Sequence, residues 1–169
     1  MTESARTSGA EGSFCPQAAP PAAAPANTRA HKTACIIARI AVGIVFIVNV
    51  QCALSFVVQP SAFAPQFELT GIPGNVAVSG LGIAFLMWNA TYPAVIALPD
   101  RFRSLFVVVL VQQAIGLIGE SIIRAGLPAG HELLAASIER FIAFDLFGLV
   151  IMGASFVALT LTKKQGHRC

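Results

Sequence analysis

Four long apolar blocks, separated by short polar segments, set the hydrophobic pattern of this chain. Glu120 and Asp145 are the only formal charges inside the blocks, which cover residues 40–58, 76–98, 104–123 and 141–162. A helix needs about 20 mostly apolar residues to cross roughly 30 Å of hydrocarbon, and these blocks lack the alternation of barrel strands. Because only helices and closed barrels satisfy their backbone groups in lipid, the pattern predicts an all-α, polytopic membrane protein, an antiparallel four-transmembrane-helix bundle.

The same pattern divides the chain into two tails and one transmembrane domain, residues 34–162. The expected spans within this domain, with their flanking residues, are about 35–58, 76–98, 104–123 and 138–162. Residues 1–33 are rich in Ala, Pro, Ser and Gly and lack the apolar periodicity that builds a core, which predicts a disordered cytoplasmic tail. Residues 163–169 are expected to form a short basic cytoplasmic tail.

Composition agrees with a membrane location, and the basic residues orient the chain. Of the 169 residues, 56% are hydrophobic and 11% charged, with a mean hydropathy of +0.75, whereas a soluble domain has about 25% charged residues. Lys and Arg gather in both tails and in the turn after the second span, while the opposite side holds Arg124 and Arg140. The positive-inside rule therefore predicts an inner-membrane or plasma-membrane protein with both termini in the cytoplasm. The lipid bilayer is its expected surrounding, and the absence of a basic face argues against nucleic-acid binding.

The connections between the spans carry further expectations. The turn from Pro99 to Arg103 is so short that the second and third spans should be antiparallel neighbours, and Tyr92 is expected to anchor the second span at the cytoplasmic interface. The loop of residues 59–75 contains three prolines and two phenylalanines, Phe63 and Phe67. This loop either rests at the membrane interface or forms a lid over an opening in the bundle.

Polar side chains inside the third span share one helical face. At 100° per residue, Gln113, Gly116, Glu120 and Arg124 lie within about 60° of one another, whereas Gln112 points about 100° away. Gly116 leaves space on this face for another helix to approach. The stretch is therefore a polar face rather than scattered polarity.

The other spans offer partners for this face, and together they define a candidate intramembrane polar site. An isolated charge at mid-bilayer costs about 2.5 to 3.5 kcal/mol on insertion scales, so we expect these groups to face the bundle. Two alternative pairs are expected across the hairpin: Glu120 with Arg140, or Asp145 with Arg124 or Arg140. The candidate site comprises Asn49, Asn89, Gln113, Glu120, Arg124, Arg140 and Asp145.

Two interpretations of this polar site remain open. Its members either form a clamp that locks the helices together or line a polar cavity that opens to the outside and binds a ligand. Gln51 lies about 160° from Asn49 on the first span, so one of the two side chains is expected to face a second protomer.

The cysteines and histidines indicate no catalytic, metal or cofactor site. The four cysteines are widely spaced without a CxxC motif, and the three histidines are equally scattered. This spacing argues against a thiol-redox enzyme and against a zinc site. No nucleophile and base pattern is visible either, so the sequence does not indicate an enzyme.

The order of features in the first half of the domain resembles a known family. RIAVGIVFI opens the first span, FELTGIPG ends the following loop, and the second span reads VSGLGIAFLMW before a short basic turn. This order resembles the DoxX-like group of small four-helix bacterial membrane proteins, over about residues 39–103. The group includes membrane subunits associated with quinone-linked oxidation of sulfur compounds.

The resemblance implies an accessory or partner-binding subunit of a membrane system, as a homo-oligomer or within a larger membrane complex. The alternative is a transporter or binder of a small polar or lipid ligand, which the polar cavity would hold. The second half of the domain, with QQAIGLIGE and IERFIAFD, departs from the resemblance.

Overall fold

The computed structural model describes residues 25–166, and every element within this range is a helix. The four long helices are α1 (Pro25–Val58), α3 (Gly71–Asn89), α5 (Arg103–Gly126) and α6 (Glu132–Gly166). Three short elements connect them: α2 (Pro60–Phe63), the 3₁₀ helix η1 (Ala64–Phe67) and α4 (Tyr92–Ala97). The expected all-α class is therefore confirmed for the described residues.

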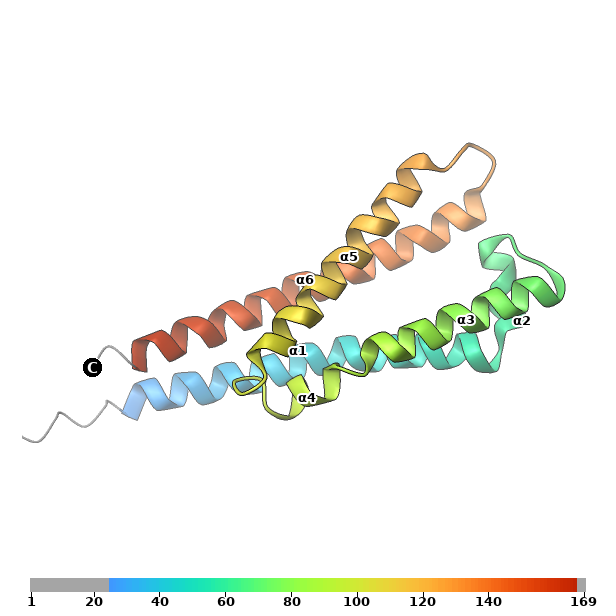
Figure 1. The fold of residues 1–169 in the computed structure, drawn as a ribbon. Helices are drawn as coiled ribbons and strands as arrows, with labels where there is room; N and C mark the ends of the chain where they lie inside the picture. The colour runs from blue at the N-terminus through green and yellow to red at the C-terminus, as the bar shows by residue number, and fades with distance from the viewer. Residues whose placement is uncertain (1–24, 167–169) are drawn as a thin grey trace, which may run out of the picture.

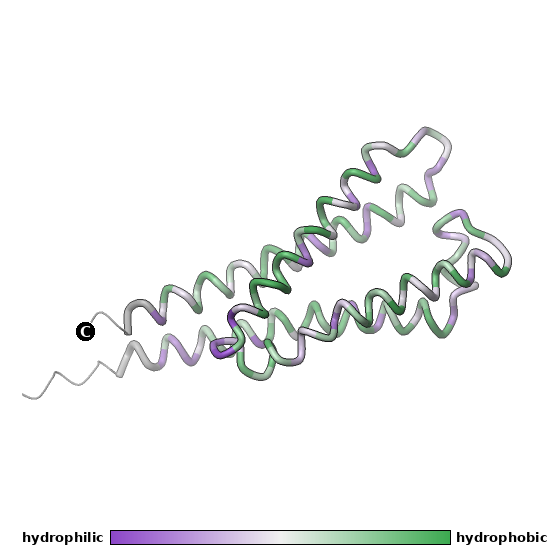
Figure 2. The backbone as a smooth tube through the Cα atoms, in the orientation of Figure 1, coloured by the Kyte–Doolittle hydropathy of each residue, from purple (hydrophilic) through white to green (hydrophobic). Residues whose placement is uncertain are grey.

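In the part of the chain that the structure describes, four helical segments are long and apolar enough to cross a membrane: Arg29–Val58, Gly71–Ala97, Arg103–Gly126 and Glu132–Lys163. Large apolar side chains cover their outer surfaces, as Ile47, Ile122 and Val150 illustrate with exposed fractions of 64%, 67% and 60%. Figure 2 shows hydrophobic positions along most of each long helix and hydrophilic positions at the turn before α5. An apolar surface of this extent belongs in hydrocarbon, so the chain is a multi-pass membrane protein.

Helix α1 is the centre of the arrangement, because it packs against α3 along one side and against α6 along another. Helix α5 packs against α6, and the two lean away from α1 and α3 in Figure 1. The start of α1 and the end of α6 lie at the same end of the molecule, here called the terminal end. The opposite end, with α2, η1 and the turn between α5 and α6, is called the loop end.

The second expected span, residues 76–98, is not one continuous helix. Helix α3 ends at Asn89, and α4 begins at Tyr92 after two turn residues. Pro93 explains the break, because it lacks the N–H that would bond the carbonyl of Asn89 and its ring crowds that carbonyl. The break also limits the expected contact between the second and third spans, since α4 rather than α3 makes the main contacts with α5.

The ends of the helical domain also differ from the expected boundaries. Helix α1 begins at Pro25, inside the expected tail of residues 1–33, and α6 continues to Gly166, inside the expected tail of residues 163–169. Pro25 stands at the first position of α1, where its missing N–H costs no helical hydrogen bond. The remaining tail residues, 1–24 and 167–169, lie outside the described residues.

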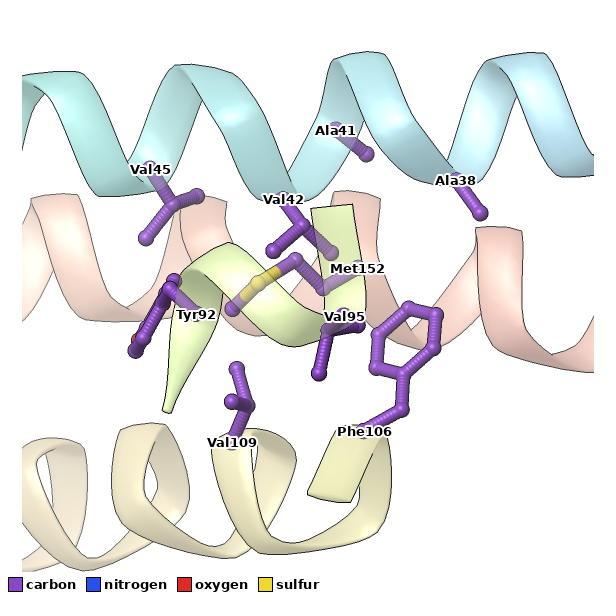
Figure 3. Close-up of a cluster of buried hydrophobic side chains, with 9 residues drawn as sticks. All are labelled: Ala38, Ala41, Val42, Val45, Tyr92, Val95, Phe106, Val109 and Met152. Atoms are coloured by element: carbon purple, nitrogen blue, oxygen red, sulfur yellow. The ribbon is translucent and has the colours of Figure 1, made fainter. Parts of the chain in front are cut away.

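A buried apolar cluster, here called the terminal-end core, forms where four helices meet (Figure 3). Tyr92 and Val95 of α4 insert between α1, α5 and α6, and both are fully buried. The expectation that Tyr92 anchors the span at the interface is therefore wrong, because the break turns its ring inward. The remaining members are Ala38, Ala41, Val42, Val45, Phe106, Val109 and Met152.

The contact between α1 and α3 depends on a glycine that can be tested. A Cβ atom at Gly82 would lie 2.7 Å from the carbonyl oxygen of Ala53 and 2.9 Å from Phe56 Cβ, whereas Gly80 has nothing within 4 Å. We expect Gly82→Ala to lower the free energy of unfolding by about 1–3 kcal/mol, because the α1 backbone must shift. The matched control Gly80→Ala should be neutral or stabilising by up to about 1 kcal/mol, since alanine is the better helix former. Equal melting temperatures of the two purified variants in detergent would contradict this close packing.

Candidate functional site

The side-chain amide of Gln113 joins three helices in the middle of the molecule. Gln113 is 2% exposed, and its Nε2 donates to Asp145 Oδ1 of α6 over 2.7 Å. Its Oε1 accepts a hydrogen bond from the Tyr92 hydroxyl of α4 over 3.3 Å. Both the nitrogen and the oxygen of this buried amide therefore form hydrogen bonds, as a hydrocarbon environment requires.

A small cavity of about 60 Å³, here called the polar chamber, adjoins this amide between α1, α3, α5 and α6. Five of the seven residues of the candidate site line it together: Asn49, Asn89, Gln113, Glu120 and Asp145. The face expected on the third span is thus brought against polar residues of every other long helix. Gly116 and four aromatic residues, Phe85, Trp88, Phe141 and Phe144, complete the lining.

Two of the chamber's oxygen atoms are buried without a hydrogen-bond partner among the described residues. They are Asn89 Oδ1 and Glu120 Oε2. Asn89 is 3% exposed, and its Nδ2 donates to the carbonyl of Phe85 over 2.7 Å, which leaves its Oδ1 free. Because buried polar atoms in native proteins are nearly always paired, two unpaired acceptors in one chamber call for an explanation.

Glycines allow the polar side chains to meet. A Cβ atom at Gly116 would collide with Asp145 Oδ2, and one at Gly148 would lie 2.8 Å from Gln113 Nε2. The sequence expectation that Gly116 admits another helix is confirmed, since α6 is the helix that approaches. Gly148 does the same for α5 from the opposite side.

The two arginines of the candidate site lie outside the polar chamber. Arg124 pairs with Glu139, with 2.8 Å between Nη2 and Oε1, and Arg140 Nη2 donates to Gln66 Oε1 over 2.8 Å. The expected pairs of Glu120 with Arg140, and of Asp145 with Arg124 or Arg140, are therefore wrong. Both guanidinium groups sit at the loop end, where long basic side chains reach polar surroundings instead of extending toward the bilayer centre.

A second cavity of about 250 Å³, here called the apolar chamber, lies between α1 and α6 toward the loop end. It shares Asn49, Phe141 and Phe144 with the polar chamber, so the two cavities are neighbours. Val48, 42% exposed, belongs to its rim. The rest of its lining consists of Cys52, Phe56, Phe63, Gln66, Ser137 and Arg140.

The loop after α1 packs on aromatic side chains of α1 and α6. Its two phenylalanines pack on Phe56 of α1, with ring centroids 5.0 Å away for Phe63 and 5.8 Å for Phe67. Phe67 also stacks on Phe141 of α6 at 6.4 Å. Phe63 and Gln66 of this loop line the apolar chamber, and residues 59–70 are here called the lid.

Two polar contacts fasten the lid to α6 and to the turn before it. One is the hydrogen bond from Arg140 to Gln66, and the other is the ion pair between His131 and Glu68. The hydrogen bond to Glu68 and its negative charge raise the pKa of His131 above its usual value, with a smaller contribution from Glu132. This ion pair is a latch that depends on a charged histidine.

Charged groups at the terminal end join the remaining elements. Asp100, in the turn before α5, has its carboxylate 3.3 Å from Lys163 Nζ, 3.8 Å from His31 Nε2 and 4.0 Å from Arg103 Nη1. Arg39 Nη2 donates to the carbonyl of Ala97 at the end of α4 over 2.7 Å. Within residues 25–166, no group of three or more His, Cys, Asp or Glu side chains lies close enough to hold a metal ion.

The aromatic lining was missed by reasoning from the sequence, although a signal for it exists. Phe85 precedes Asn89 by one helical turn, and Phe141 precedes Asp145 by one helical turn. Residues four apart share a helical face. Each aromatic residue therefore points where the polar residue points, and this spacing would have placed both beside the polar site.

Comparisons with protein-family models, with curated proteins and with solved structures find no match for this chain.

The amide bridge can be tested with its sequence neighbour as the control. We expect Gln113→Leu to lower the free energy of unfolding by about 1–3 kcal/mol, because it leaves Asp145 Oδ1 buried without its donor. Gln112→Leu should change stability by about 0.5 kcal/mol at most, because Gln112 accepts a single weak bond of 3.4 Å from Thr91. Thermal unfolding in detergent measures both variants, and a larger effect at Gln112 would refute the central role of Gln113.

The latch should depend on pH. His131 has a raised pKa in the folded protein, so its contribution is fully present below the unfolded pKa of about 6.5 and is lost as pH rises through the folded value. We expect a cysteine introduced by Ser61→Cys in the lid to react faster with a membrane-impermeant maleimide as the latch opens. The same cysteine in a His131→Gln background is the control, since it cancels the intrinsic pH dependence of the thiol.

The measured quantity is the ratio of the two labelling rates at residue 61, followed by peptide mass spectrometry. The ratio of the His131-containing protein to the His131→Gln protein should be below one at about pH 6 and approach one at about pH 9. A ratio that stays constant over this range would show that the latch does not hold the lid.

Proposed function

We propose that this protein is a small multi-pass membrane protein that binds an amphipathic ligand between its helices. The polar head of the ligand occupies the polar chamber, and its apolar body occupies the apolar chamber. The two cavities together offer one end that carries buried hydrogen-bonding groups and one end lined mainly by apolar and aromatic side chains, with Gln66, Ser137 and Arg140 among them. Ligand sites commonly combine an apolar lining with a few convergent polar groups.

The observation that carries this proposal is the pair of unpartnered oxygen atoms, Asn89 Oδ1 and Glu120 Oε2. A clamp that serves stability alone would pair its buried acceptors, as Gln113 and Asp145 do over 2.7 Å. The break between α3 and α4 supports the same interpretation, because interrupted helices in membrane proteins mark binding sites. Asn89 is the last residue of α3 at that break.

We also infer that the four spans form an antiparallel bundle in a cell inner membrane or plasma membrane, with both tails in the cytoplasm. The basic residues of the terminal end, including Arg39, Arg103 and Lys163, support this orientation through the positive-inside rule. In this orientation the lid of residues 59–70 lies on the outer side. The ligand then binds in the outer half of the membrane.

A second candidate function is that of an accessory subunit in a larger membrane complex or in a homo-oligomer, as the DoxX-like resemblance implies. Gln51 favours it, because its side chain is exposed on α1 within a membrane-spanning segment. An amide in hydrocarbon gains a hydrogen bond when a neighbouring transmembrane helix supplies a partner. In this role the exposed side of α1 is the contact surface.

The substitution Glu120→Gln tests the ligand site against the clamp. Because Glu120 Oε2 has no hydrogen-bond partner within residues 25–166, we expect its replacement to change the free energy of unfolding by about 0.5 kcal/mol at most. The same variant should lose a small molecule that copurifies with the unaltered protein, measured by mass spectrometry of solvent extracts. Arg124→Gln, which breaks an exposed ion pair outside both chambers, is the control and should retain that molecule.

Two results would contradict the proposal. One is a loss of stability in Glu120→Gln as large as that in Gln113→Leu, which would make Glu120 part of a clamp. The other is equal recovery of copurifying molecules from Glu120→Gln and the unaltered protein.

A further inference from the structure

The electrostatic character of the polar chamber is one-sided. Among the described residues, its two ionisable side chains, Glu120 and Asp145, are both carboxylic acids, and no Lys, Arg or His side chain lines it. The nearest arginines along the same helices, Arg124 and Arg140, are engaged by Glu139 and Gln66. A cationic head group is attracted by the ionised form of either acid, and this attraction is strongest in a chamber of low dielectric.

The remaining polar atoms of the chamber also favour a donor. The two unpartnered atoms are both acceptors, and they come from α3 and α5. A ligand that offers only acceptors, such as a carbonyl or a carboxylate, would leave them unpaired. An ammonium group carries up to three N–H donors and no acceptor, so it complements both atoms and the Asp145 carboxylate.

The aromatic lining adds an independent preference for a cation. Phe85, Trp88, Phe141 and Phe144 surround the same small volume as the two carboxylic acids. The faces of aromatic rings attract cations, Trp most strongly, and aromatic cages recognise organic ammonium groups. Helix α3 also ends at Asn89 beside the chamber, and a helix C-terminus carries a partial negative charge.

The sizes of the two cavities set the shape of the ligand. The polar chamber of about 60 Å³ admits a single small head group, since one water molecule takes a share of about 30 Å³ in the liquid. The apolar chamber of about 250 Å³ exceeds a cavity of about 150 Å³ that accommodates benzene. A primary or secondary amine that carries one aromatic ring or a short alkyl chain fits both.

We infer that the ligand of this site is a lipophilic organic cation, with its ammonium head between Glu120, Asp145 and Asn89 and its apolar body between α1 and α6. The inference rests on the proposed function, because it names the chemical class of ligand for the same two chambers. It adds the requirement that the head group is positively charged, which the proposed binding of an amphipathic ligand does not include.

Trp88 provides the readout, because it is the single tryptophan of the chain and it lines the polar chamber. The full-length protein in lipid nanodiscs is titrated with three probes that share one body: phenylbutylamine, phenylbutanol and phenylbutyrate. They offer a cationic, a neutral and an anionic head. We expect phenylbutylamine to change the fluorescence of Trp88 saturably and to bind at least about tenfold more tightly than phenylbutanol, the ratio that corresponds to one charge-assisted hydrogen bond.

The variants separate a site effect from partition into lipid. Glu120→Gln should weaken phenylbutylamine binding at least about tenfold, again the ratio of one charge-assisted hydrogen bond. Glu139→Gln removes a carboxylate on α6 that lies outside both chambers, and it should leave the affinity unchanged. Any linear, non-saturating change that persists in Glu120→Gln measures partition and is subtracted.

Three outcomes would overturn the inference, and they differ in what they leave standing. Equal saturable binding of phenylbutanol and phenylbutylamine would retain the ligand site and remove its charge requirement. Saturable displacement of phenylbutylamine by sodium ions at constant ionic strength would assign the chamber to an inorganic cation. Absence of any saturable change would exclude the organic cation, while copurification from the unaltered protein and from Glu120→Gln decides the proposed function separately.

Discussion

The buried amide of Gln113 is the interaction on which the middle of this molecule depends. One side chain of α5 donates to α6 through Asp145 and accepts from α4 through Tyr92. Lipid offers no alternative partner for any of these groups, so their separation leaves each of them unsatisfied. Gly116 and Gly148 matter for the same reason. A larger residue at either position would hold α5 and α6 too far apart for the Gln113 amide to reach Asp145.

The chambers lie between two apolar regions that hold the helices in place. Trp88 and Phe144 pack against the terminal-end core, while Phe85 and Phe141 pack against Phe56 beneath the lid. Polar contacts outside these regions fasten each end, through Asp100 at the terminal end and through the lid at the loop end. The polar residues are thus enclosed by packing on both sides, which is why a cavity persists among them.

The sequence predicts the helices and the polar face of the third span better than it predicts which charged side chains pair with each other. Four spans follow from apolar length, and the shared face of Gln113 and Glu120 follows from helical spacing. Pro93 can be recognised in the sequence as a residue that interrupts helices. Its effect is that Tyr92 turns inward, and this depends on where α4 meets α1. The expected partners of Glu120 and Asp145 failed for another reason, because similar depth in the membrane does not fix the rotation of neighbouring helices.

The position of Val48 bears on how the proposed ligand would reach the two chambers. This residue belongs to the rim of the apolar chamber and lies on an outer surface that hydrocarbon covers. A molecule that approaches there is drawn from the bilayer, where its local concentration is its concentration in water multiplied by its partition coefficient. Weak intrinsic affinity then suffices for high occupancy when a ligand accumulates in lipid, and a change in membrane composition alters occupancy without any change in the protein.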